Sequence, residues 1–195
     1  RGDDNARYRR IVAQLRNPVD RAYSDYCMLY RRGEVSADIS RHLDPRVAAE
    51  GRFISSGRYC AQLQDYISLF GKDRLLILTY ERVRSHPAEQ LRDLRAFLGL
   101  DPVGQMNAVH VSKVKDKTVP MISPQLKRYV NWLKPAVAPL RSTKAFQALR
   151  QKFAGEITYP LLPPDLKKRI TDYYANERLD LEKLINRPLP EWHER

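Results

Sequence analysis

The pattern of apolar and polar residues in the first hundred positions predicts strands separated by helices. An apolar, β-prone run at residues 8–16 predicts a first strand. The run stops at Asn17-Pro18, a pair that favours helix initiation because Asn is a preferred N-cap and proline suits the first helical turn. This helix is expected to end at Gly33. A compact apolar run at residues 74–80 predicts a second strand, covered on both faces.

Helical periodicity recurs along the rest of the chain. Residues 33–57 are expected to be irregular apart from a short helix at 37–43. Longer helices are predicted at 58–70, 87–98, 123–133, 143–153 and 165–185, the last with a break near Asn176.

The order strand, helix, helix, strand, helix predicts an α/β fold in which the two strands are parallel. Two strands alone do not make a stable sheet. Further strands are therefore expected, either unrecognised in this sequence or upstream of Arg1. We expect one domain over 1–195, with an α/β part at 1–102 and a mostly helical part at 103–195.

Charge adds a regional feature to this picture. The chain has 35 Lys and Arg against 23 Asp and Glu, a net charge of +12. Residues 103–155 hold ten basic residues and one acid. This basic segment favours an anionic partner, or it is a solvated surface without a specific ligand.

Composition narrows the classes of protein. No stretch is long and apolar enough for a membrane helix, and no signal peptide is apparent. Two cysteines cannot build a disulfide scaffold, and the four histidines show no metal-ligand spacing, so no metal is expected. A reducing cytoplasm is the default compartment.

The segment after the first strand carries the candidate chemistry. Arg16 lies at the carboxyl end of that strand, where open α/β sheets bind ligands. The helix starting at Pro18 directs its free N–H groups to the same place, so the two predict a site for a phosphate-like dianion. Arg21 and Ser24 share a helix face. A solvated Arg21 and a Ser24 hydroxyl bonded within its own helix remain open alternatives.

At this point the sequence resembles a known family. Residues 16–26 (RNPVDRAYSDY) are similar to the 3′-phosphate-binding motif of sulfotransferases that use 3′-phosphoadenosine 5′-phosphosulfate (PAPS). The resemblance continues through Gly57-Arg58-Tyr59, 74–83 (RLLILTYERV), 91–102 and 179–192, so it covers essentially the whole chain. The bacterial and heparan-sulfate-type branch is the most similar.

The resemblance implies a P-loop-NTPase-like parallel sheet flanked by helices. It implies transfer of a sulfuryl group from PAPS to a hydroxyl or amine of an acceptor such as a carbohydrate or small metabolite. Arg16 and Ser24 would hold the 3′-phosphate, with Arg21 beside them, and Tyr59 would approach the nucleotide or pack. A nucleotide clamp is assigned to three lysines, Lys113, Lys115 and Lys117.

The family's phosphosulfate loop has no counterpart here, and no catalytic base is assigned. Both are expected upstream of Arg1, which makes the chain an N-terminally incomplete sulfotransferase domain. Glu81, which follows the second strand, is expected to be structural and to cap the next segment. A bacterial, cytoplasmic enzyme and a homodimer are the accompanying expectations.

Two other readings compete with this one. The first is a non-catalytic polyanion- or nucleic-acid-binding module that uses residues 103–155. That segment lacks a recognition motif, and its aromatic residues fit helix faces better than stacking platforms, so nucleic acid is not favoured. The second is a relative that keeps the fold without catalysis.

Overall fold

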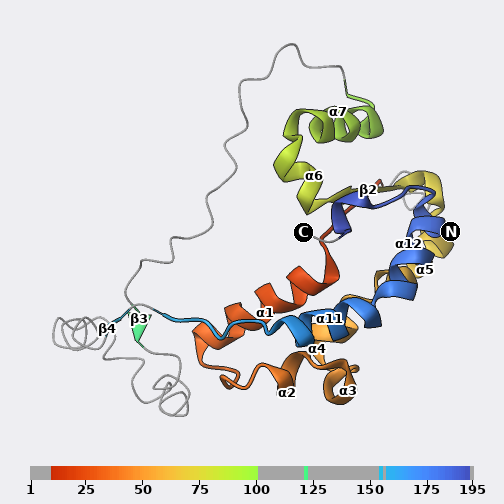
Figure 1. The fold of residues 1–195 in the computed structure, drawn as a ribbon. Helices are drawn as coiled ribbons and strands as arrows, with labels where there is room; N and C mark the ends of the chain where they lie inside the picture. The colour runs from red at the N-terminus through yellow and green to blue at the C-terminus, as the bar shows by residue number, and fades with distance from the viewer. Residues whose placement is uncertain (1–9, 101–120, 123–153, 156, 194–195) are drawn as a thin grey trace, which may run out of the picture. The chain divides into compact units, whose positions relative to one another are not determined.

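The structure, a computed structural model, describes residues 10–100, 121–122, 154–155 and 157–193 (Figure 1). The chain divides into two compact units. The first takes the described residues within Arg1–Arg21, Ser56–Ser112 and Thr171–Arg195, and the second takes those within Ala22–Ser55 and Lys113–Ile170. The helices predicted at 123–133 and 143–153 lie outside the described residues.

The first unit contains a parallel pair of strands, β1 (Ile11–Leu15) and β2 (Leu75–Thr79). Their register runs from Ile11 opposite Leu75 to Leu15 opposite Thr79. Both strands therefore end at the same edge of the sheet. The predicted α/β class with parallel strands is confirmed, and each strand is shorter than its predicted run.

Helices pack against this strand pair. The helix α5 (Tyr59–Phe70) lies beside α12 (Ala175–Ile185), and α6 (Tyr80–Ser85) and α7 (Pro87–Leu98) follow β2 (Figure 1). Short 3-10 turns η2 (Lys72–Arg74) and η5 (Pro190–Trp192) complete the unit. Its buried core joins residues of the first strand, α5, α12 and the C-terminal segment: Leu15, Tyr59, Leu63, Leu181, Leu189 and Trp192.

The second unit holds most of α1 (Pro18–Arg32), which continues into it from the first unit. It also contains α2 (Ser40–Leu43), α3 (Pro45–Ala48), α4 (Arg52–Ser55), most of α11 (Pro164–Tyr173) and a two-residue antiparallel pair, β3 (Met121–Ile122) with β4 (Ala154–Gly155). Tyr26 is fully buried, and its ring meets the ring of Phe53 edge-on.

Most predicted helices are confirmed, with differences at several places. Residues 33–57, expected to be irregular apart from a helix at 37–43, hold α2, which begins only at Ser40, and also α3 and α4. Gly33 has a positive φ of 74° just after α1, as expected for a helix end. The C-terminal helix breaks at Tyr174, two residues before the predicted Asn176. The helix α6 was not predicted, because Tyr80 extends the apolar run of β2. The cap of α7 is His86, while the Ser85 hydroxyl donates to the Glu81 carbonyl.

Candidate anion-binding site

Arg16 follows β1 and faces the residue that follows β2. Because Leu15 pairs with Thr79, Arg16 comes next to Tyr80, and its guanidinium carbon lies 4.9 Å from the centre of the Tyr80 ring. This is the geometry of a cation–π contact. The Arg16 Nε is buried and has no hydrogen-bond partner among the described residues. A buried donor without a partner is costly, so an acceptor such as an anion would complete this group.

Two backbone N–H groups at the start of α1 are already hydrogen-bonded within the protein. Asn17 acts as the N-cap, because its Oδ1 accepts from the Val19 amide at 3.0 Å. The Asn17 amide donates to Glu81 Oε1 at 2.9 Å, and Pro18 has no amide hydrogen. The expected free N–H groups are therefore engaged at both Asn17 and Val19. Arginine side chains, more than the helix end, provide the donors of this site.

Arg21 lies one turn further along α1 and hydrogen-bonds the hydroxyl of Tyr174. Tyr174 is buried, and its hydroxyl packs against Gly57. A Cβ at Gly57 would lie 2.5 Å from the Tyr174 hydroxyl oxygen, so only glycine leaves room for this contact. The glycine of the Gly57-x-Tyr59 motif thus lets Tyr174 approach and hold Arg21.

Two buried tyrosines, Tyr59 and Tyr174, lie beside these arginines, and both tyrosines are uncharged at neutral pH. Burial raises the pKa of Tyr59 to about 12, although Arg21 and Arg16 oppose the shift. Burial also raises the pKa of Tyr174, again against Arg21. The Tyr59 hydroxyl therefore stays protonated at neutral pH and donates to the Arg16 carbonyl at 2.8 Å. Tyr59 packs in the core and also touches the backbone of the site.

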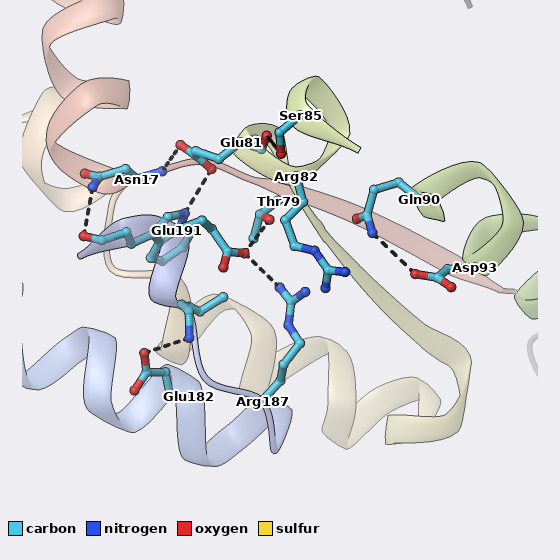
Figure 2. Close-up of polar contacts among 12 residues, drawn as sticks. Asn17, Thr79, Glu81, Arg82, Ser85, Gln90, Asp93, Glu182, Arg187 and Glu191 are labelled. Carbon is cyan, nitrogen blue, oxygen red and sulfur yellow. Dashed lines mark hydrogen bonds and ion pairs between the residues drawn. The ribbon is translucent and has the colours of Figure 1, made fainter. Parts of the chain in front are cut away.

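A network of polar side chains joins Asn17, Thr79 and Glu81 to the C-terminal segment (Figure 2). The second oxygen of Glu81 accepts from the indole Nε1 of Trp192 at 2.9 Å, and the Asn17 side-chain amide donates to the Trp192 carbonyl at 3.4 Å. Next to them, the buried Thr79 hydroxyl donates to Glu191 at 2.7 Å, and Arg187 lies 3.6 Å from the same carboxylate. The C-terminal segment is thus bound to the end of the sheet.

The structure brings together three of the predicted site residues, Arg16, Arg21 and Tyr59. Ser24 is an exposed residue of α1 in the second unit, and its predicted role stays a prediction. Lys113, Lys115 and Lys117 lie outside the described residues.

Both Glu81 carboxylate oxygens are hydrogen-bonded within the protein. The expected cap of the next segment is wrong, because Glu81 lies inside the first turn of α6, whose start has no side-chain cap, and its carboxylate binds the start of α1 instead.

Sequence reasoning missed Tyr80, Tyr174 and Trp192. Tyr80 could have been found, because it follows a strand just as Arg16 does. No local pattern reports the contacts of Tyr174 and Trp192, since their partners are distant in sequence.

This arrangement can bind an anion. Arg16 and Arg21 supply two positive charges, and both lie close enough to lower the pKa of Tyr59. Within the described part of the chain, no group of three or more His, Cys, Asp and Glu is placed to hold a metal. No described helix has the length and apolar character needed to cross a membrane.

A parallel strand pair with an arginine at its carboxyl edge defines the chain as an α/β protein with a candidate anion site. The family model "Sulfotransferase domain" matches residues 6–175. The chain therefore belongs to the sulfotransferase family.

Curated relatives agree with this assignment. The chain is similar to human bifunctional heparan sulfate N-deacetylase/N-sulfotransferase 2, with 26% identity over 94% of this chain and 20% of the human protein. The Drosophila melanogaster bifunctional heparan sulfate N-deacetylase/N-sulfotransferase is 24% identical over 94% of this chain and 17% of its own length. The chain thus spans about a fifth of these curated relatives.

A solved structure has a similar fold. The sulfotransferase from Alicyclobacillus acidocaldarius superposes with a TM-score of 0.56 and 23% identity, over 95% of this chain and 57% of that one. At this identity the likeness concerns the fold alone. It supports the expected parallel sheet flanked by helices, of the P-loop-like kind.

Proposed function

We propose that the chain binds the 3′-phosphate of PAPS through Arg16 and takes part in sulfuryl transfer. One observation carries the proposal: a strand-end arginine stacks on Tyr80 and keeps a buried Nε that no described residue satisfies. Membership in the sulfotransferase family supports PAPS as the co-substrate. It also favours this function over the polyanion- or nucleic-acid-binding alternative.

In such a transfer, an acceptor oxygen or nitrogen attacks the sulfur of PAPS. A new bond to sulfur forms as the bond to the 5′-phosphate oxygen breaks, and the acceptor's proton passes to a base. The leaving group is adenosine 3′,5′-bisphosphate. Arg16 would hold the far end of this nucleotide, which helps to fix the sulfuryl group in line for attack.

The other predicted contacts are part of the proposal. Arg21 is held beside Arg16 by Tyr174 and adds a second positive charge for the nucleotide. Ser24 is assigned to the same phosphate, and the lysines Lys113, Lys115 and Lys117 to the nucleotide, by the resemblance of the sequence.

For the acceptor we propose a hydroxyl or amine of a carbohydrate. The support is that the relatives are heparan sulfate N-deacetylase/N-sulfotransferases. PAPS labelled in its sulfur, offered with an amine-bearing glycan and with its N-acetylated form, tests this choice. Label on both glycans indicates a hydroxyl acceptor, and label on the amine form alone indicates an amine. A cytoplasmic location and a homodimer remain proposals from the sequence.

Calorimetric binding of adenosine 3′,5′-bisphosphate tests the nucleotide site. We expect Arg16→Ala to weaken binding about tenfold to a hundredfold, because a charge-assisted hydrogen bond contributes roughly 1.5–3 kcal/mol. Arg92→Ala is the matched control, since Arg92 is exposed on α7 and its loss removes the same charge. Equal affinities of Arg16→Ala and the parent chain would overturn the assignment.

A further inference from the structure

The peptide group between Arg16 and Asn17 is held at both of its polar atoms by side chains. The carbonyl oxygen of Arg16 accepts from the Tyr59 hydroxyl at 2.8 Å. The amide of Asn17 donates to Glu81 Oε1 at 2.9 Å. Fixing this peptide plane fixes the direction in which the Arg16 side chain leaves the backbone.

Glu81 is in turn held by Trp192. The indole Nε1 donates to the other Glu81 oxygen at 2.9 Å, so each carboxylate oxygen is hydrogen-bonded to a described residue (Figure 2). The Trp192 side chain is only 5% exposed, and its ring lies 6.0 Å from the ring of Tyr59. Trp192 therefore touches both side chains that hold the Arg16–Asn17 peptide.

We propose that Glu81 and Trp192 are positioning residues of the anion site, through which the C-terminal segment sets the orientation of Arg16. The inference rests on the proposed function, in which Arg16 binds the 3′-phosphate. Neither residue touches the ligand in this scheme. Both act by holding the peptide from which the Arg16 side chain extends.

The direction in which Glu81→Gln changes the nucleotide affinity distinguishes a positioning role from a purely electrostatic one. Glu81 carries a negative charge beside the site, and the field of that charge disfavours an anion. If charge were its only influence, Glu81→Gln would tighten nucleotide binding. Positioning predicts weaker binding, because a glutamine offers one acceptor oxygen to the two donors and leaves Asn17 or Trp192 facing an amide NH₂.

The binding test is a double-mutant cycle with adenosine 3′,5′-bisphosphate as the titrated ligand. We expect Glu81→Gln to weaken binding about tenfold, and Trp192→Phe, which keeps an aromatic ring but loses the N–H donor, several-fold. In an Arg16→Ala background neither change should weaken binding further, because both act through Arg16. Glu34→Gln is the matched control, an exposed Glu in the second unit.

Unchanged or tighter binding by Glu81→Gln overturns the positioning role. Equal losses of nucleotide affinity in the parent chain and in the Arg16→Ala background also overturn it, because they indicate a general effect on the fold. Thermal unfolding of each variant confirms that the protein measured is folded. If one of the two variants does not fold, the other completes the cycle.

Amide hydrogen exchange tests the same proposal without any nucleotide. The Asn17 amide should be protected in the parent chain and should exchange faster in Glu81→Gln and in Trp192→Phe. Protection that persists in both variants overturns the proposal even if the nucleotide binds. Conversely, lost protection together with no nucleotide binding by the parent chain would contradict the proposed function and leave the Glu81–Trp192 contact established.

Discussion

The two parallel strands end side by side, but the residues that follow them differ in their hydrogen bonding. Arg16, after β1, keeps a buried donor that no described residue satisfies. Glu81, just beyond β2, has both of its carboxylate oxygens hydrogen-bonded within the protein. At this edge of the sheet, the residue after β1 can therefore bind a ligand, and the residues after β2 support that binding residue. A binding arginine needs such support, because a mobile guanidinium loses entropy when it binds.

Substitutions among the residues that support Arg16 should lower the free energy of unfolding more than substitution of Arg16 itself. Trp192→Ala should have the largest effect. The ring of Trp192 is buried against Tyr59 and its indole N–H binds Glu81. Its removal leaves a cavity and an unpaired carboxylate oxygen, so we expect a loss of about 3–5 kcal/mol in the free energy of unfolding. Urea denaturation measures this loss. A loss below about 1 kcal/mol would show that the C-terminal segment contributes little to the fold.

Tyr59→Phe removes the hydrogen bond from the Tyr59 hydroxyl to the Arg16 carbonyl, and it should have an intermediate effect on the free energy of unfolding. At pH 7 we expect a loss of about 1 kcal/mol in the free energy of unfolding, because the Arg16 carbonyl loses its donor. The pH dependence should change as well. The pKa of Tyr59 is raised from 10.0 to about 12 in the folded chain, so between these values the unfolded chain releases the proton first.

The contribution of Tyr59 is therefore complete below pH 10 and is lost as the pH rises toward 12. Over this pH range the free energy of unfolding falls by up to about 2–3 kcal/mol, from the size of the pKa shift, and this fall is separate from the hydrogen bond tested at pH 7. Urea denaturation at several pH values should show a shallower alkaline fall in Tyr59→Phe than in the parent chain. Parallel curves for the two proteins would contradict the raised pKa of Tyr59.

The ligand-binding end should show the smallest effect on stability. Arg16→Leu removes a cation–π contact of roughly 0.5–1 kcal/mol and also removes the buried unsatisfied Nε, so the two changes oppose each other. We expect the free energy of unfolding to stay within about 1 kcal/mol of the parent value while nucleotide affinity falls. A loss as large as that of Trp192→Ala would mean that Arg16 is itself part of the scaffold.

Local signals predicted much of the fold. Asn17-Pro18 and Gly33 marked the ends of α1, and the two apolar runs marked strands that are indeed parallel. The start of α6 was missed because Tyr80 continues the apolar pattern of β2.

The candidate site was only partly predictable. Arg16 could be chosen because the end of a strand is visible in the sequence, and residues 16–26 resemble a family motif. The roles of Glu81, Tyr174 and Trp192 depend on tertiary contacts that no short pattern reports. The expectation of free N–H groups at the start of α1 was wrong at Asn17 and Val19. The Glu81 carboxylate accepts from the Asn17 amide, and the Asn17 side chain accepts from the Val19 amide.

The hydrogen bonds around Asn17 also bear on the order in which the protein acquires its site. Asn17 and Glu81 are 64 residues apart, Glu81 and Trp192 are 111 apart, and Asn17 and Trp192 are 175 apart. Contacts between such distant residues close large loops, which is slow and entropically expensive. During synthesis on the ribosome, the Arg16 side chain emerges before Trp192, so its supporting contacts are complete only after Trp192 has been synthesised and has packed into place.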